Sequence, residues 1–87
     1  MNSEQIIQLE DRHQLKTYHK APIAVVEGEG LTVTDAEGKR YLDFYSGHAV
    51  TLTGHCHPHV VQAIQKQAER LIFYSNIVCN DERAAYS

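Results

Sequence analysis

The sequence has few of the features that mark a special class of protein. It contains only two cysteines, Cys56 and Cys79, so at most one disulfide bridge is available. The N-terminal stretch MNSEQIIQLEDRHQ has neither the basic region nor the apolar region of a secretory signal. We therefore expect a cytoplasmic protein with reduced thiols. No apolar run approaches the roughly 20 residues that span a bilayer, so we expect no membrane partner.

Positive charge is also scarce. The formal net charge is −3 and the basic residues form no cluster, so we expect no nucleic-acid partner. Hydrophobic residues make up 43% and charged residues 22%, which is typical of soluble globular proteins. The 87 residues leave room for one small domain at most. A chain of this size buries only roughly 60% of its unfolded surface, so its core is expected to be marginal.

The first residues predict a short helix or a partly ordered arm. Asn2 or Ser3 is a suitable N-cap, and Gln5 follows Asn2 at the spacing of a capping box. The apolar residues of this segment give only a loose face, and a helix of this length is marginal in water. A frayed terminus and a segment docked on another surface both remain open.

Three short strands are predicted next. The apolar run 23–26 is followed by 31–34, which alternates as a half-buried strand does, and 40–44 is the return strand. Residues 35–39 form the second turn, with Gly38 suited to a positive φ. Together these segments predict a small antiparallel meander, which needs a covering layer to be stable.

The pair Gly28 and Gly30 invites a dinucleotide-binding interpretation, which we reject. That motif needs a third glycine three positions later, and Val33 occupies the position. The motif also needs a helix next, whereas a strand pattern follows. We therefore expect residues 28–30 to form a turn.

The second half of the chain predicts a glycine-rich loop and an amphipathic helix. Residues 46–54 are the loop, and Pro58 stands where a first helical residue belongs. Apolar residues then recur at helical spacing, namely Val60, Val61, Ile64, Ala68, Leu71 and Ile72. Asn80 or Asp81 caps a further helix that has little more than one turn before Ser87. We therefore expect a fragment of a longer protein.

Histidine and cysteine crowd together just before the predicted helix. His55, Cys56, His57 and His59 are all possible metal ligands, so a small His/Cys metal-binding module is an alternative function. Closed zinc sites usually take their ligands from two separated pairs, and no second cluster exists here. We expect instead that these side chains shape the loop and cap the helix. Cys56 is expected to be a structural thiol rather than a nucleophile.

Four motifs in order carry a resemblance to a known family. They are Glu27–Gly30, Asp35–Gly38, Tyr41–Phe44 and the Gly-His-Cys-His-Pro run Gly54–Pro58. Residues 18–87 resemble the N-terminal part of the class III, pyridoxal-phosphate-dependent aminotransferases, most closely the acetylornithine and ornithine aminotransferase branch. The resemblance implies an α+β fragment, with an antiparallel meander followed by an amphipathic helix, at the start of a fold type I transferase.

The resemblance also implies a function. The full-length enzyme is expected to bind pyridoxal 5′-phosphate, form a homodimer and move an amino group from an ω-amine such as N-acetylornithine to 2-oxoglutarate. The motifs for the Schiff-base lysine and the cofactor phosphate are not recognised here, so we assign no catalytic, cofactor-binding or metal residue and expect the chain alone to be inactive. Racemase, aminomutase and decarboxylase relatives share similar N-terminal segments and remain open.

Two substrate-binding residues follow from the resemblance. His48 falls where relatives place a side chain that faces the substrate, often isoleucine or an aromatic residue. Tyr18 matches a tyrosine that contacts substrate in the ornithine branch. Local hydrogen bonding for His48 and packing for Tyr18 are the alternatives. The resemblance divides the chain into an N-terminal helix or arm (1–17), a meander with the substrate-entrance loop (18–56) and a helix that starts the large domain (57–87).

Overall fold

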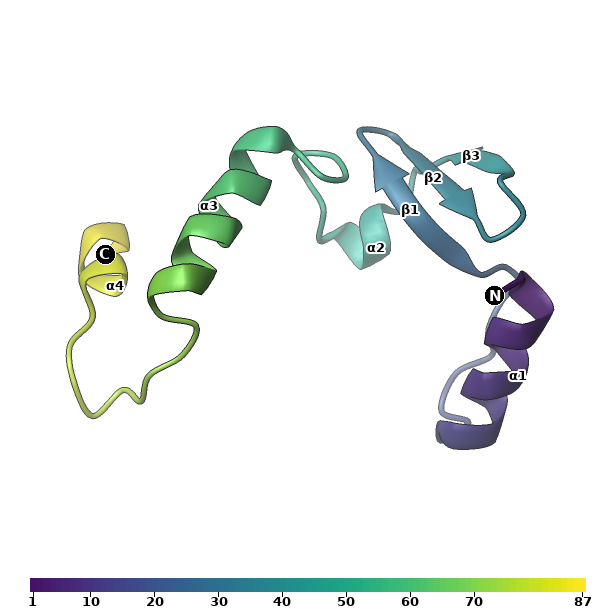
Figure 1. Ribbon diagram of the computed structural model, residues 1–87, viewed down its shortest axis with the longest axis horizontal. Helices are drawn as coiled ribbons and strands as arrows, with labels where there is room; N and C mark the ends of the chain where they lie inside the picture. The colour runs from purple at the N-terminus through teal and green to yellow at the C-terminus, as the bar shows by residue number, and fades with distance from the viewer. The chain divides into compact units, whose positions relative to one another are not determined.

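The computed structural model describes residues 1–87, which divide into two compact units. The first unit, residues 1–57, contains helix α1 (Ser3–His13), a three-stranded sheet and the short turn α2 (Ser46–Ala49). The second unit, residues 58–87, contains two helices (Figure 1). None of the helices has both the length and the hydropathy needed to span a bilayer.

Helix α1, Ser3–His13, begins with the predicted capping box. The Asn2 side chain accepts a hydrogen bond from the Gln5 backbone N–H at 2.9 Å, and the Gln5 side chain accepts from the Asn2 N–H at 3.0 Å. These two bonds satisfy donors that a helix N-terminus otherwise leaves unpaired. The backbone N–H and hydroxyl of Ser3 both donate to the Glu37 carboxylate at 3.0 Å, which attaches the start of α1 to the second turn of the sheet.

The predicted meander is confirmed. Strands β1 (Val25–Glu29), β2 (Thr32–Asp35) and β3 (Arg40–Leu42) pair antiparallel in the order β1-β2-β3. The turn expected at residues 28–30 was placed too early, because Gly28 and Glu29 still belong to β1. A two-residue connection, Gly30 and Leu31, reverses the chain, with Gly30 at φ +56°. Because two residues suffice for a hairpin, the strand continues through the first glycine.

Asp35 organises the turn between β2 and β3. Its Oδ1 accepts hydrogen bonds from the backbone N–H groups of Glu37 and Lys39 at 3.0 and 2.9 Å, and its Oδ2 accepts from the Tyr41 hydroxyl at 2.9 Å. Burial alone raises the pKa of Asp35, but the hydrogen bonds from Lys39, Tyr41 and Glu37 outweigh it and leave the pKa lowered. Gly38 has φ +85°, as predicted.

Very little of the chain is buried. Ala24 and Asp35 are the two buried residues, at 6% and 8% exposure, and no large side chain is fully enclosed. Large apolar side chains of the sheet and of the following loop stay exposed, among them Phe44 at 91% and Leu52 at 81%. The marginal core expected from chain length is thus confirmed, and the apolar surface exceeds what these elements cover.

In the second unit, α3 (Pro58–Arg70) begins at the predicted proline and α4 (Asp81–Tyr86) follows its predicted cap. The Asn80 side chain accepts a hydrogen bond from the Arg83 N–H at 3.1 Å. None of the predicted apolar stripe of α3 is buried. The helix ends before Leu71 and Ile72, which the spacing had included. The β-branched and aromatic residues after Leu71 lose side-chain freedom in a helix, which favours this earlier end.

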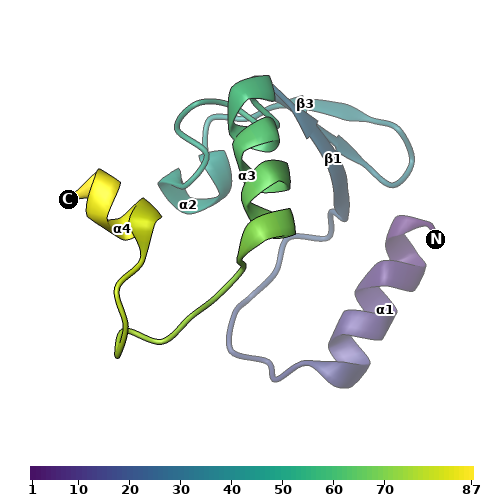
Figure 2. The same ribbon diagram turned by 60° about the vertical axis from the view of Figure 1, so that its left-hand side comes forward.

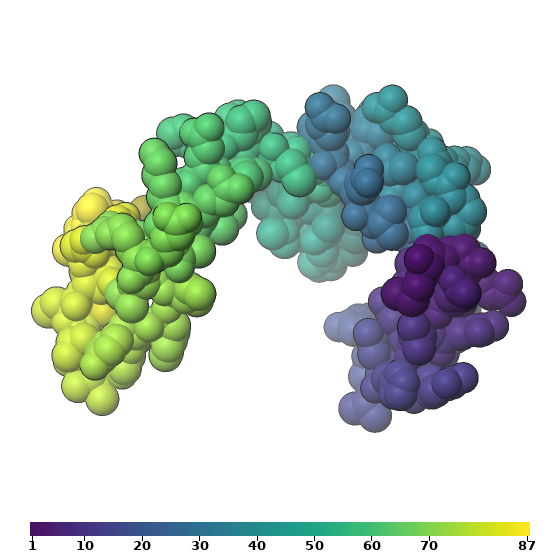
Figure 3. Space-filling view, viewed as in Figure 1, coloured from purple at the N-terminus to yellow at the C-terminus, as the bar shows by residue number.

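Helix α4 folds back toward the end of α3. After α3 the chain turns back, and α4 follows this reversal (Figures 2 and 3). Arg70 donates to Asp81 at 2.9 Å and to Glu82 at 3.3 Å, joining the last turn of one helix to the first turn of the other. The neighbouring carboxylates raise the pKa of Arg70, and Arg70 lowers the pKa of Asp81. All three side chains are about two-thirds exposed, so this contact is a weak one.

Candidate functional site

The loop of residues 43–55 leaves the sheet after β3 and returns to it. At its start, the Asp43 N–H donates to the Leu31 carbonyl at 2.8 Å. At its end, His55 and Gly30 exchange two backbone hydrogen bonds, each 2.9 Å long. Both ends of the loop are therefore fastened to the same tight turn of the β1–β2 hairpin.

Asp43 and His55 stand at the two ends of the loop, which we call its neck. The Asp43 side chain links these two ends. Its Oδ1 accepts hydrogen bonds from the Tyr45 and Ser46 N–H groups at 2.8 and 3.0 Å, while its Oδ2 lies 2.5 Å from Nε2 of His55. The two side chains of the pair are 11% and 19% exposed. The hydrogen bond with His55 lowers the pKa of Asp43, and those from Ser46 and Tyr45 lower it further.

Gly28 makes room for the His55 ring. A Cβ atom added at Gly28 would lie 2.8 Å from Cγ and 2.9 Å from Cβ of His55, closer than such atoms approach. The ring therefore lies directly on the backbone of β1, and a glycine inside the strand permits this close approach. Of the crowded histidines, His55 shapes the loop as predicted.

Inside the loop the backbone makes a left-handed turn, α2 (Ser46–Ala49). Ser46, Gly47, His48 and Ala49 have φ values of +56°, +59°, +70° and +59°. The turn is closed by hydrogen bonds from Ala49 N–H to the Tyr45 carbonyl at 3.0 Å and from Val50 N–H to the Ser46 carbonyl at 2.9 Å. Left-handed geometry costs about 1–2 kcal/mol for each residue other than glycine. The sequence predicted a loop here and missed this turn, because only its one glycine signalled such geometry.

His48, the first predicted substrate residue, lies in this turn with its side chain exposed. Its Nδ1 is 2.5 Å from the Tyr45 hydroxyl, and the two rings meet edge to face with centroids 5.5 Å apart. Sequence reasoning had not singled out Tyr45. Its position three residues before His48, within one short loop, is the sequence feature that could have linked Tyr45 to His48. A contact with substrate stays a prediction for His48.

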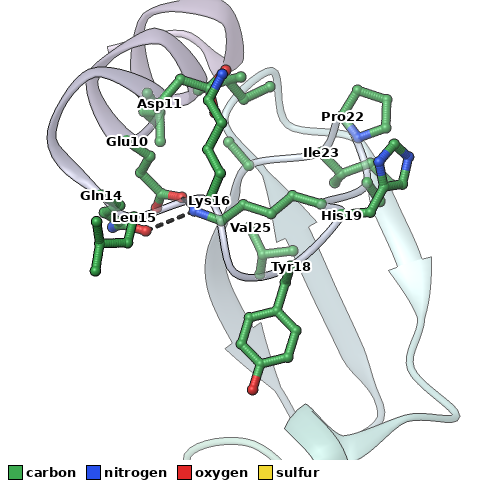
Figure 4. Close-up of a pocket in the computed structure, with 15 residues that line it drawn as sticks. Glu10, Asp11, Gln14, Leu15, Lys16, Tyr18, His19, Pro22, Ile23 and Val25 are labelled. Carbon is green, nitrogen blue, oxygen red and sulfur yellow. Dashed lines mark hydrogen bonds and ion pairs between the residues drawn. The ribbon is translucent and has the colours of Figure 1, made fainter.

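Tyr18, the second predicted substrate residue, lines a different feature. A groove of about 700 Å³ runs between α1 and residues 14–25. Lys20 donates to Glu10 at 2.6 Å and to Gln14 at 2.7 Å. The Tyr18 ring points away from α1 (Figure 4) and is 84% exposed. Tyr18 therefore belongs to the groove-lining segment after α1, whereas His48 contacts Tyr45 in the loop. A contact between Tyr18 and substrate likewise stays a prediction.

The metal-binding alternative gains no support. His55 is engaged by Asp43, and Cys56 has an exposed, free thiol. No group of three or more histidine, cysteine, aspartate and glutamate side chains comes together in a way that fits a metal ion. Cys79 is likewise free, so the two cysteines do not form a disulfide.

Comparison with known proteins gives a consistent result. The family model for class-III aminotransferases matches residues 14–87. The chain is 52% identical over 77 residues to the acetylornithine aminotransferase of Methanocaldococcus jannaschii, covering 88% of this chain and 19% of that protein. It is 37% identical over 87 residues to the ornithine aminotransferase of Saccharomyces cerevisiae, covering all of this chain and 20% of the relative.

Solved structures agree. The acetylornithine aminotransferase of Elizabethkingia anophelis superposes with a TM-score of 0.93 at 40% identity, covering 99% of this chain and 22% of that one. The ornithine δ-aminotransferase of Plasmodium falciparum gives a TM-score of 0.91 at 29% identity, covering 98% of this chain and 22% of that one. The predicted fold class, a small meander and helices belonging to the aminotransferase fold, is confirmed. The chain spans about a fifth of the length of the curated relatives it matches, and it belongs to the class-III aminotransferase family.

Proposed function

We propose that this chain is a segment of an aminotransferase that moves an amino group from an ω-amine donor, such as N-acetylornithine, to 2-oxoglutarate. The observation that carries the proposal is the 52% identity to an acetylornithine aminotransferase over 88% of the chain. Similar proteins include both acetylornithine and ornithine aminotransferases, which supports a donor of this chemical class.

The full-length enzyme is proposed to use pyridoxal 5′-phosphate, which supplies an electron sink for the transfer when bound. Such a cofactor needs a lysine amine that is available for a Schiff base. In the groove beside α1, Lys20 is instead held by Glu10 and Gln14 at 2.6 and 2.7 Å. Neither Lys20 nor Lys16, the other lysine that lines the groove, lies in a recognised Schiff-base motif, so we propose no cofactor site here. We assign the Schiff-base lysine and the phosphate-binding residues to parts of the enzyme outside this chain.

The contribution of this segment is proposed to be the wall of the substrate entrance, through His48 and Tyr18. His48 is exposed on the left-handed turn, and its Nδ1 contacts the Tyr45 hydroxyl. When that hydroxyl donates, the imidazole carries its hydrogen on Nε2. His48 then offers an N–H group to an acceptor at the distal end of the donor, such as an acetyl oxygen.

Exposed apolar surface supports the rest of the proposed organisation. We infer that residues 1–17 form an arm, that 18–56 supply the meander and entrance loop, and that 57–87 begin the large domain. Because no residue of α3 is buried within its unit, its apolar stripe is available to pack on the remainder of a larger enzyme. We also propose that the full-length enzyme is a homodimer located in the cytoplasm.

The test uses the full-length enzyme purified with its cofactor. N-Acetylornithine, ornithine and 4-aminobutyrate are each supplied with 2-oxoglutarate, and glutamate formation is measured. We expect glutamate with at least one of these donors and a Schiff-base absorbance band in the resting enzyme. An enzyme that forms no glutamate, or that racemises or decarboxylates the donor instead, contradicts the proposal. His48→Ala and Tyr18→Ala then report whether these side chains affect the KM of the donor.

A further inference from the structure

We propose that Asp43 and His55 are positioning residues for donor binding: their side chains close the neck of the 43–55 loop and thereby hold His48 in its left-handed conformation. The inference rests on the proposed function, since it requires His48 to meet the donor. Neither residue needs to touch substrate, and neither is placed among the reacting groups.

The neck is closed by two independent sets of contacts. Backbone hydrogen bonds fasten Asp43 to Leu31 and His55 to Gly30, on the two residues of one hairpin turn. The side-chain contact of 2.5 Å between Asp43 Oδ2 and His55 Nε2 then joins the two ends to each other. At 11% and 19% exposure, the pair is largely shielded from water, which strengthens a charge-assisted hydrogen bond.

The carboxylate also acts directly on the strained backbone. Oδ1 of Asp43 accepts a hydrogen bond from the N–H of Ser46 at 3.0 Å, and Ser46 is the first residue of this turn to have a positive φ. Residues other than glycine keep left-handed geometry only where their surroundings fix it. One oxygen of the carboxylate is thus bound by His55. The other oxygen binds the first residue of the turn that carries His48.

This arrangement predicts which kinetic constant changes. If the neck loosens, the turn relaxes toward ordinary backbone geometry and the His48 ring samples several positions. Binding the donor then has to order the loop first, which raises the KM of the donor. Because the reacting groups are assigned to other parts of the enzyme, kcat is expected to change little.

The chain contains a matched control in Asp35. Like Asp43, it accepts two backbone N–H groups on one carboxylate oxygen and a side-chain donor, the Tyr41 hydroxyl, on the other. It lies one strand earlier and shapes a turn to which no substrate contact is assigned. Asp35→Asn therefore removes an equivalent charge from an equivalent local structure without touching the neck.

The experiment measures steady-state kinetics with N-acetylornithine on the full-length holoenzyme of the wild type, Asp43→Asn, His55→Gln and Asp35→Asn. We expect Asp43→Asn and His55→Gln to raise the donor KM about tenfold while kcat stays within about twofold. Asp35→Asn is expected to leave both constants within about twofold. Amide hydrogen exchange on the same samples is expected to speed up at residues 44–50 in the first two variants and at 35–41 in the control.

The outcomes separate the alternatives. Faster exchange at 44–50 with an unchanged KM would make the neck a structural feature only, and unchanged exchange would mean that the pair does not hold the loop; each result overturns the proposal. If one variant does not fold, the other tests the same neck, and failure of both to fold assigns the pair to folding and also overturns it. A wild-type enzyme without amino transfer refutes the proposed function instead.

Discussion

The hydroxyl of Tyr45 lies 2.5 Å from Nδ1 of His48, three residues along the same loop. This contact engages Nδ1 of the imidazole and holds the ring against that of Tyr45. We predict that Tyr45→Phe raises the donor KM about threefold to tenfold, because one hydrogen bond contributes roughly 0.5–1.5 kcal/mol. Kinetics with N-acetylornithine measure the change. Tyr41→Phe, which removes the hydroxyl bound to Asp35, is the control and is expected to leave the KM unchanged.

Gly28→Ala is predicted to destabilise the loop. The new methyl group would lie 2.8 Å from the His55 ring, and overpacking of this kind costs about 1–3 kcal/mol. Urea unfolding of the full-length enzyme measures the loss. The same substitution in a His55→Gly background is expected to cost less, because both the ring and the Cβ atom that the new methyl group would meet are gone. Equal costs in the two backgrounds would show that the ring does not lie on the strand as described.

The pKa of Asp43 predicts a dependence of stability on pH. The His55 ring, followed by the N–H groups of Ser46 and Tyr45, lowers this pKa below its usual value of 3.8. The carboxylate therefore contributes its full stabilisation above about pH 4 and loses it as the pH falls through the lowered pKa. We expect the difference in thermal midpoint between the wild type and Asp43→Asn to narrow as the pH falls below about pH 4. A difference that widens as the pH falls below about pH 4 would contradict the assignment.

Arg70→Ala is predicted to have a small effect. Although Arg70 contacts both Asp81 and Glu82, its side chain is 60% exposed, so the free energy of unfolding should fall by no more than about 1 kcal/mol. The effect should shrink further in 1 M salt, which screens charges beyond about 3 Å. Lys66→Ala, an exposed position on the same helix, is the control. A loss above about 2 kcal/mol would indicate that this ion pair is shielded in the enzyme.

Much of the local structure is predictable because its causes are local. Asn2, Pro58 and Asn80 each begin a helix through an interaction or a backbone preference confined to one turn. The strands likewise follow from alternation and from turn residues such as Gly38. The predicted ends of strands and helices were less accurate than their positions. Nothing in the sequence requires a turn to begin at the first available glycine.

The neck of the loop was not predictable in the same way. Asp43 and His55 are separated by twelve positions, and no spacing rule pairs an aspartate with a histidine at that distance. The crowding of His55 with Cys56 instead suggested metal chemistry. The left-handed turn was missed for a related reason, because three of its four residues are not glycine and the Asp43 carboxylate that binds the Ser46 N–H lies outside the turn. The predicted roles of His48 and Tyr18 came from the resemblance alone.

The order of the strands has a practical consequence. With β2 in the middle, β1 and β3 are both outer strands, and most of their outward-facing backbone groups have no neighbouring strand within residues 1–57. If this sheet is produced in isolation, its two edge strands can each form hydrogen bonds with a strand of another molecule. We therefore expect an isolated peptide of these residues to form aggregates that bind amyloid dyes, and a solubilising fusion next to β3 should delay their appearance.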